Sequence, residues 1–215
     1  MYCIALYVTT SHSAFMYDSY LQAPIVSSEC PRWEPLGNAI VTNGKRVAVA
    51  SDQLVVAVVQ DQNVTVYRYN DSMSSWNATA NPIDPQFTDD DGWFVDLSLS
   101  ADGGVVAIGD YEYDSWRDRV QIFTAHPEDG WIKLGFAIEG ENPGDRAGWS
   151  ILLSADGTTV VIGAFLNDGN GSFSGRTQVF SYDPTNDVWN QRGGDIDGEA
   201  RHKDSIVYQV APSIG

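Results

Sequence analysis

The sequence predicts an all-β protein built from repeats of about 50 residues, each contributing four short strands. The first observation behind this prediction is a Trp-x-x-x-Gly-x-x-Ile marker, found at residues 33–40, 131–138 and 189–196 and, without the Gly, at residues 76–83. The second is a segment at residues 99–109 that matches residues 153–163 position by position, with an eroded copy at residues 49–58. Four strands in a unit of this length are typical of a β-propeller blade.

The third repeat shows the four expected strands most clearly. Segments rich in β-branched and aromatic residues cover residues 149–153, 159–164, 177–182 and 189–196. Asp-Gly and Asn-Gly dipeptides separate such segments along the chain, and they suit tight turns because they tolerate positive φ. A β-sandwich would also fit the strand lengths, but it would not explain the in-register repetition.

Three whole repeats fit in the chain as blades, at residues 40–76, 83–131 and 138–189. The remaining residues 197–215 supply one further strand, and residues 1–40 contain three candidate strands. Together these two ends would complete a fourth blade, so that the whole chain forms one four-bladed propeller domain. The competing interpretation is a fragment of a larger propeller.

Composition excludes several classes of partner and site. The chain has 12 Lys and Arg against 29 Asp and Glu, a net charge of −17. This charge disfavours nucleic acid as a partner, because no basic stripe is present to contact phosphates. No apolar run approaches about 18 residues, so no membrane insertion of this segment is expected. Two cysteines, Cys3 and Cys30, are too few for a disulfide scaffold or a four-cysteine zinc site.

The third repeat reads Gly-Asp-Arg-Ala-Gly-Trp-Ser-Ile-Leu-Leu-Ser-Ala-Asp-Gly at residues 144–157, followed by Val-Val-Ile-Gly-Ala at residues 160–164. This pattern resembles the FG-GAP-like repeats of integrin-α-type propellers. The likeness covers residues 84–215 well and residues 40–83 loosely. It implies a β-propeller at the cell surface or outside the cell that binds a protein or glycan ligand.

The sequence departs from this family at its calcium loop. Integrin repeats carry an Asp-rich loop between the first two strands, and here that link is reduced to Ser-Ala-Asp-Gly. Such a link is too short to surround a calcium ion with six or more oxygen atoms. Asp102 and Asp156 are therefore predicted to be turn residues, although the resemblance leaves calcium open as a cofactor.

A second resemblance is to kelch repeats, through the stretch from Tyr182 to Trp189. The kelch Gly-Gly pair is missing, because Ala164 follows Gly163. This resemblance would change the class of partner but not the propeller.

No catalytic constellation is visible in the sequence. Its three histidines, His12, His126 and His202, have no metal-ligand spacing, and no nucleophile elbow or phosphate loop is present. The chain is therefore expected not to be an enzyme. The Trp residues of the repeats are predicted to pack between blades rather than to bind a ligand.

The predicted ligand-binding surface is the loop after Gly109, because aromatic and acidic residues alternate in it. Its residues are Asp110, Tyr111, Glu112, Tyr113, Asp114 and Trp116, with Asp168 in the equivalent loop of the next repeat. The acidic cluster Asp89, Asp90 and Asp91 is expected on the same propeller face and is the predicted metal site. The alternative is that these charges are solvated and keep the protein soluble.

Four Asn-x-Ser/Thr sequons begin at Asn63, Asn70, Asn77 and Asn170. They exceed the number that composition would give by chance, which favours a secretory route with glycosylation at these residues. The expected location is extracellular or at the cell surface, although residues 1–8 make a poor signal peptide.

These observations predict a non-enzymatic interaction or adhesion module that binds a protein or glycan through propeller-face loops, with or without help from a cation. Two alternatives stay open: a polysaccharide-acting propeller enzyme and an intracellular kelch-like scaffold. An enzyme would show a kinetic acid or base, whereas a binding module would show only saturation.

Overall fold

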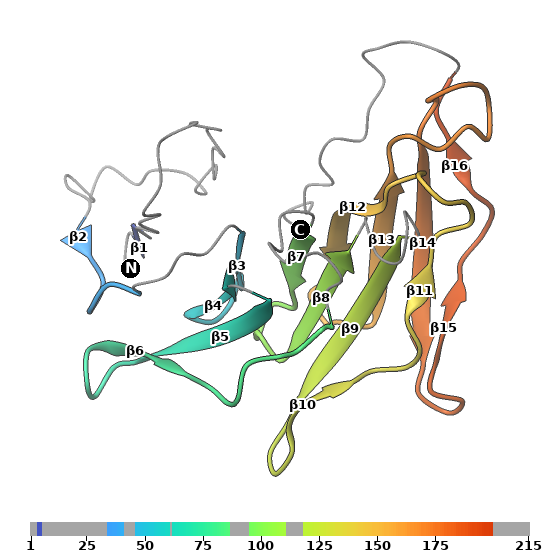
Figure 1. Cartoon of the computed structure of the whole chain (residues 1–215). Coiled ribbons are helices and arrows are strands. Elements are labelled where there is room, and N and C mark those ends of the chain that lie inside the picture. Colours follow the sequence, from blue (N-terminus) through green and yellow to red (C-terminus); the bar gives the residue numbers. More distant parts are fainter. Residues whose placement is uncertain are drawn as a thin grey trace.

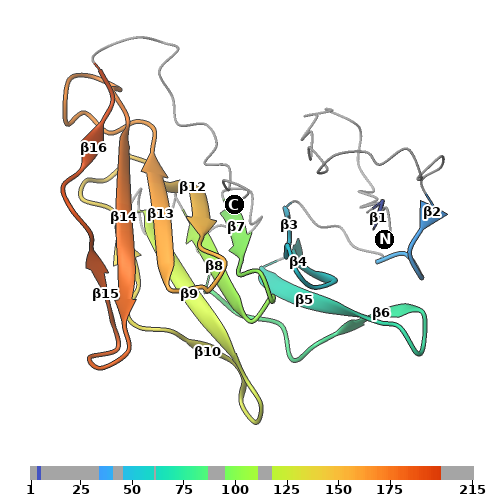
Figure 2. The same ribbon diagram turned by 180° about the vertical axis from the view of Figure 1, so that it is seen from behind.

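The computed structural model describes residues 4–5, 34–40, 46–60, 62–86, 95–110 and 118–199, and every regular element in them is a β-strand. Two short strands, β1 (Ile4–Ala5) and β2 (Glu34–Pro35), pair in parallel. The remaining strands form three antiparallel sheets that follow one another along the chain (Figures 1 and 2).

The first four strands of each sheet form a meander in which consecutive strands are neighbours. The first consists of β3 (Val47–Val49), β4 (Val55–Gln60), β5 (Asn63–Asn70) and β6 (Ser75–Ala78). The second consists of β7 (Val95–Leu99), β8 (Val105–Asp110), β9 (Arg119–His126), β10 (Gly130–Lys133) and β11 (Ile138–Glu139). The third consists of β12 (Ala147–Leu153), β13 (Thr159–Ala164), β14 (Arg176–Asp183), β15 (Val188–Gln191) and β16 (Ile196–Asp197). Successive four-stranded meanders are propeller blades, and the predicted fold class is confirmed.

The fourth strand of a blade is broken, and the Trp-x-x-x-Gly-x-x-Ile marker spans the break. In the second blade β10 and β11 both pair with β9, and in the third β15 and β16 both pair with β14. The marker glycines Gly135 and Gly193 lie in the breaks with φ of 72° and 77°. The marker isoleucine then rejoins the third strand, as Ile83 does through its bridge to Val64 in the first blade.

Adjacent blades pack face to face through cross-strand rows of side chains. Ala48, Ala57 and Val66 pair in register across the first blade and pack against the Val106 side of the second. Ser98, Ala107 and Ile122 form the equivalent row in the second blade, where Ala107 and Ile122 pack against the third blade. Small side chains on one face of a blade therefore pack against larger side chains of the next blade, and together they fill the space between the two sheets.

The repeat tryptophans hold neighbouring outer strands together. The indole Nε1 of Trp189 donates to the carbonyl oxygen of Leu134 at 2.7 Å, and that of Trp76 donates to Leu36 at 2.9 Å. Each indole therefore links its own blade to the Leu-Gly step of the preceding marker. The prediction that these tryptophans serve packing between blades is confirmed for both residues.

The Asp-Gly links are turns, as predicted. Asp102 Oδ1 accepts hydrogen bonds from Ser100 Oγ at 2.7 Å and from the Gly104 amide at 2.8 Å. In the third blade Asp156 Oδ1 accepts from Ser154 Oγ at 2.6 Å and the Thr158 amide at 3.0 Å. These bonds lower the pKa of both carboxyl groups, because they stabilise the ionised form.

The three observed sheets run over residues 47–78, 95–139 and 147–197, and each overlaps one of the predicted blades at 40–76, 83–131 and 138–189 but ends beyond it. Most of residues 1–40 and all of residues 200–215 lie outside the described part of the chain. The fourth blade, and with it the number of blades, therefore stays a prediction.

Candidate functional site

The structure places Asp110, the first residue of the predicted ligand-binding loop, inside the protein. It is 1% exposed and forms an ion pair with Arg119 at 3.3 Å. Arg119 also donates to the carbonyl oxygens of Pro85 and Gln86, which ties the entry of the second blade to its third strand. In the described structure the Asp110 carboxylate is thus buried beside an arginine, and its contact with a ligand stays a prediction. Tyr111, Glu112, Tyr113, Asp114 and Trp116 lie outside the described residues.

Asp168 is exposed and shapes its own loop. Its Oδ1 atom accepts a hydrogen bond from the Phe173 amide at 2.6 Å. Asp89, Asp90 and Asp91 lie outside the described residues. Within the described ranges no group of three or more His, Cys, Asp or Glu side chains is arranged to hold a metal ion. Calcium at the acidic cluster stays a prediction.

The four sequon asparagines lie on strands and one loop. Asn63 and Asn70 are the first and last residues of β5, and both are partly exposed. Asn77 on β6 and Asn170 in the loop before β14 are exposed. The Asn170 side chain donates to the Gly198 carbonyl oxygen at 3.0 Å. Their glycosylation stays a prediction.

A buried carboxyl group that the sequence did not single out lies just before β9. Asp118 is 1% exposed, and its Oδ2 atom accepts a hydrogen bond from the Ala147 amide at 2.9 Å. Its Oδ1 atom is also buried and has no hydrogen-bond partner among the described residues. The pKa of Asp118 is raised to about 7, mainly by burial and to a lesser extent by the Asp145 carboxylate, while the backbone amides of Ala147 and Arg146 and the charge of Arg146 act in the opposite direction. Asp118 can therefore exchange a proton near neutral pH.

Asp145, which lies near Asp118, accepts hydrogen bonds from two asparagine side chains. Its Oδ2 atom accepts hydrogen bonds from the side-chain amides of Asn167 at 2.6 Å and Asn142 at 3.1 Å. These bonds fix the loops that lead into β12 and out of β13. Asp145 therefore places a carboxylate beside Asp118, and its Oδ2 atom is held by two asparagine side chains.

A second buried carboxyl with a raised pKa, Asp96 on β7, has a structural role. Burial raises its pKa, and its Oδ2 atom accepts a hydrogen bond from the Ile151 amide at 2.9 Å. Since Ile151 lies on the first strand of the next blade, this bond links two blades. Both carboxyl groups have a raised pKa, but only Asp118 combines a pKa near 7 with a buried oxygen that lacks a hydrogen-bond partner in the described structure.

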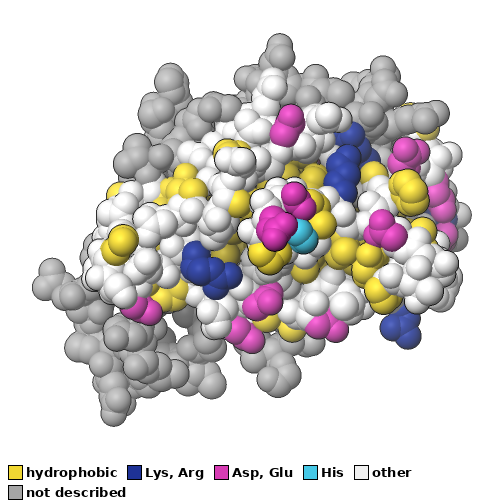
Figure 3. Space-filling model, turned by 90° about the horizontal axis from the view of Figure 1, so that it is seen from below, with side chains coloured by type: hydrophobic (Ala, Val, Ile, Leu, Met, Phe, Trp, Pro, Cys, Tyr) yellow, Lys and Arg dark blue, Asp and Glu magenta, His cyan; other side chains and the backbone are white. Residues whose placement is uncertain are grey.

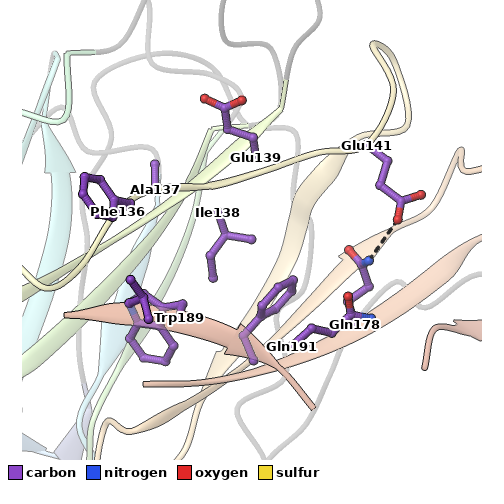
Figure 4. Close-up of a pocket in the computed structure, with 10 residues that line it drawn as sticks. Phe136, Ala137, Ile138, Glu139, Glu141, Gln178, Trp189 and Gln191 are labelled. Atoms are coloured by element: carbon purple, nitrogen blue, oxygen red, sulfur yellow. Dashed lines mark hydrogen bonds between the residues drawn. The ribbon is translucent and has the colours of Figure 1, made fainter. Parts of the chain in front are cut away.

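A groove of about 400 Å³ lies between the second and third blades. It is lined by one segment of the second blade, residues 136–139 with Glu141, and by side chains of β14 and β15. These lining residues are Phe136, Ala137, Ile138, Glu139, Glu141, Gln178, Phe180, Val188, Trp189 and Gln191. Figure 4 shows Ile138 pointing toward Trp189, while the Glu139 carboxylate points to the other side of its segment. Glu141 lies beside Gln178 and accepts its hydrogen bond.

Asp118 lies directly behind the wall of this groove. Gly140, between the lining residues Glu139 and Glu141, donates its amide hydrogen to the Asp118 carbonyl oxygen at 2.8 Å. A β-carbon on Gly140 would lie 3.2 Å from the β-carbon of Asp118. The wall is therefore only one backbone thick at this point.

No local signal in the sequence points to the buried Asp118 carboxyl group or to the groove between the second and third blades. Asp118 precedes an arginine in an acidic stretch, which is typical of a solvated turn, and only the approach of β12 buries it. The groove residues are separated by about 40 positions along the chain, and the Trp and Ile of the marker were assigned to packing. Phe136, whose side chain is 75% exposed, was not singled out in the sequence analysis.

The described residues include no helix with the length and apolar character needed to cross a membrane. No protein-family model matches the sequence, and no curated protein matches it.

Several solved structures match over most of the described chain. A candidate 6-phosphogluconolactonase from Bacteroides uniformis has 15% identity and a TM-score of 0.49, covering 74% of this chain and 41% of its own. The periplasmic gluconolactonase of Pseudomonas aeruginosa has 16% identity and a TM-score of 0.46, covering 74% and 42%. The β-propeller domain of the Trilobed protease from Pyrococcus furiosus has 12% identity and a TM-score of 0.37, covering 71% and 41%. The chain thus spans about two fifths of the length of these structures.

The expectation of a non-enzymatic adhesion module is corrected on these matches. The activities they name are those of enzymes, and neither an FG-GAP nor a kelch protein is among the three. At these identities and TM-scores, however, the likeness carries no activity over to this chain. A functional assignment has to rest on the chain's own residues.

Proposed function

We propose that this chain is part of a β-propeller hydrolase that opens sugar lactones, with Asp118 as its acid–base group. The observation that carries the proposal is the buried Asp118 carboxyl, whose pKa is raised to about 7 and whose Oδ1 atom lacks a partner within the described structure. A perturbed carboxyl beside a groove is a physical mark of a functional site.

The chemistry follows from the two states of this carboxyl. Ionised Asp118 accepts a proton from water as the water oxygen attacks the lactone carbonyl carbon. The resulting acid then gives its proton to the ring oxygen as the carbon–oxygen bond breaks, which regenerates the carboxylate. One water molecule is consumed, and the product is the open hydroxy acid. A group with a pKa near 7 serves both steps at neutral pH.

A cyclic ester suits this site better than a glycosidic bond. Canonical glycoside hydrolysis uses two carboxyl groups on opposite sides of the scissile bond, one of them a nucleophile or a base. Here the second carboxylate, Asp145, is bound by two asparagine amides. Lactone opening needs only one group that both accepts and returns a proton.

The substrate reaches Asp118 by displacement of the segment at residues 139–141. This segment is held to β9 by the two-residue strand β11, through the pairs Ile138–Val120 and Glu139–Arg119. The Gly140 amide, which donates to the Asp118 carbonyl oxygen, and the ion pair of Glu141 with Arg176 also hold this segment, so these contacts have to open with the strand. The groove on its outer side then holds the sugar while Asp118 acts on the ester.

The test is the hydrolysis of glucono-δ-lactone by the whole chain, followed in a pH-stat with the spontaneous rate subtracted. The expected rate increases as the pH rises through about 7, because the carboxylate is the base. Asp118→Asn should reduce the enzymatic rate about 100-fold or more and abolish this pH dependence. The matched control is Asp129→Asn, since the Asp129 side chain is 69% exposed at the tip of the β9–β10 hairpin. Absence of hydrolysis by the wild-type chain, or an unchanged rate in Asp118→Asn, would overturn the proposal.

Export to the cell surface or beyond is part of the same proposal. It is supported by the four sequons, two of which, Asn77 and Asn170, are exposed. A shift in electrophoretic mobility after glycosidase treatment of the native protein would test it.

A further inference from the structure

The groove between the second and third blades has the size and lining of a site for one sugar unit. Its volume of about 400 Å³ lies at the small end of ligand pockets. Apolar side chains form much of its surface, and Phe136 stands 75% exposed at its rim. The electron-rich faces of aromatic rings attract the weakly positive C–H groups on one side of a sugar ring.

Amide groups supply the polar contacts of the groove. Gln178 donates to Asp195 Oδ1 at 2.9 Å, and Gln191 donates to the same oxygen at 2.7 Å. Their side-chain carbonyl oxygens are acceptors for hydroxyl groups, and the Gln191 amide also has a second N–H, whereas Gln178 donates to Glu141 as well. A few such groups around an apolar floor are typical of a site that binds an uncharged polyol.

The charge around the groove is negative. Glu139 and Glu141 belong to the lining residues, but only the Glu141 carboxylate lies beside the groove side chain Gln178, and no Lys, Arg or His is among the lining residues of the described structure. The nearest cation shown to interact with the lining, Arg176, is paired with Glu141, with Asp195 at 2.9 Å and with Asp197 at 2.7 Å. Three carboxylates surround one guanidinium, so this cluster keeps a net negative charge. The acidic side chains spread over the face in Figure 3 are in keeping with the net charge of −17.

A phosphate group would be repelled from such a site. Proteins bind phosphate with Arg or Lys side chains, or with the amides at a helix N-terminus. The groove lining contains no such cation, and the described residues contain no helix. A phosphorylated sugar would bring about two negative charges toward Glu141 and the carboxylates around Arg176.

We infer that the groove binds an uncharged sugar or sugar lactone and excludes its 6-phosphorylated counterpart. This inference rests on the proposed function only in taking the bound sugar as the substrate of Asp118. It sets the substrate class as neutral sugar lactones and makes Glu141, with the carboxylates around Arg176, the group that rejects the phosphate. Phe136 provides the stacking surface.

Binding is tested apart from hydrolysis, with D-glucose and D-glucose 6-phosphate as probes. Both are titrated into the whole chain and followed by calorimetry at low salt. Glucose should bind, and Phe136→Ala should weaken its binding about 10-fold. The matched control is Phe173→Ala, since Phe173 is 59% exposed in another loop and does not line the groove. Glucose 6-phosphate should bind at least about 10-fold more weakly than glucose.

The electrostatic repulsion between the carboxylates of the groove and a phosphate group can be tested separately. The variant Glu141→Gln should reduce the difference in affinity between the two probes, and so should added salt, which screens the repulsion. Equal or tighter binding of glucose 6-phosphate would overturn the inference, as would glucose binding that is unchanged in Phe136→Ala. If Asp118→Asn still binds glucose while the wild-type chain hydrolyses no lactone, the inference stands and the proposed function fails. If lactone is hydrolysed but groove variants bind and react like the wild type, the inference fails and the proposed function stands.

Discussion

At the scale of single residues, the same amino acid takes opposite roles according to its surroundings. Asp156 lies in an exposed turn, where hydrogen bonds from Ser154 and Thr158 lower its pKa. Asp118 lies in the interior, where burial raises its pKa to about 7. The first carboxylate stabilises its turn in the ionised form, whereas the second destabilises the fold when it ionises. This cost is typical of a group retained for chemistry.

The raised pKa of Asp118 predicts how stability changes with pH. The unfolded chain releases this proton near pH 4, but the folded chain keeps it up to about pH 7, so wild-type stability falls as the pH rises between these values. Asp118→Asn cannot ionise, so it should not lose stability in this way. The difference in the free energy of unfolding between Asp118→Asn and the wild type should therefore shift in favour of the variant by about 2 to 3 kcal/mol between pH 5 and pH 8. Urea unfolding at the two pH values measures this difference, and pH 5 avoids the pI of about 4.2.

Asp156→Asn is the control of opposite sign. At pH 8 the free energy of unfolding of Asp156→Asn should be about 1 kcal/mol lower than that of the wild type, because charge-assisted hydrogen bonds are lost. That difference should shrink when the pH falls below the unfolded pKa of 3.8. An Asp118→Asn difference that does not vary with pH would show that Asp118 is ionised in the folded protein at pH 5.

At the scale of elements, each Asp-Gly turn serves two blades. Gly103 has a φ of 70°, and a β-carbon there would lie 2.6 Å from Val55 Cγ1 on the preceding blade. Gly157 repeats this arrangement, with a φ of 70° and Val105 Cγ2 at 2.7 Å. The turns also connect through the backbone, since the Asp52 amide donates to Ala101 and the Ala101 amide donates to Ala155. The glycine is therefore required both by the turn and by the neighbouring strand.

Gly103→Ala should consequently cost more than backbone strain alone. We expect a loss of about 2 to 3 kcal/mol, from the positive φ together with the clash against Val55. Gly193→Ala is the matched control, because Gly193 has a φ of 77° but no atom within 4 Å of the added β-carbon. This control should lose about 1 kcal/mol. Thermal unfolding of both variants measures the difference, and equal losses would mean that the turn does not press against the preceding blade.

At the scale of the whole molecule, no described blade buries its faces alone. One core cluster joins β4 and β5 to β7, β8 and β9, and the next joins β8 and β9 to β12 and β13. Hydrogen bonds from the Ile151 and Leu153 amides to Asp96 and Ser98 join the inner strands of the second and third blades. The proposed site belongs to this scale too, because Asp118 lies at the start of one blade's third strand and the groove lies between two blades.

This sharing of cores predicts that the three described blades unfold together. Val106→Ala removes two methyl groups from a fully buried position in the cluster between the first two blades. The expected loss is about 1 to 3 kcal/mol. Amide hydrogen exchange should show an equal loss of protection in β4, β8 and β13, since all three exchange through the same global opening. Reduced protection confined to one or two blades would instead show independent unfolding of the repeats.

The repeat pattern by itself determined the all-β class, the blade as the repeating unit and most strand positions. Strand periodicity, Asp-Gly turns and the Trp marker are local signals, and they reappear in each repeat because each blade solves the same local packing problem. They also identified Asp102 and Asp156 as turn residues and Trp76 and Trp189 as packing residues. The adhesion function inferred from the resemblance did not hold, since fold-level likeness does not fix function.

Tertiary structure alone decided where the charged and aromatic side chains act. Asp110 was predicted at the surface, but Arg119 and the chain entering the second blade enclose it. Asp118 became an acid with a near-neutral pKa only because β12 covers it, and the groove formed only because two blades meet beside Gly140. Burial and charge interaction depend on contacts between residues far apart in sequence, and a pattern read along one chain does not contain those contacts.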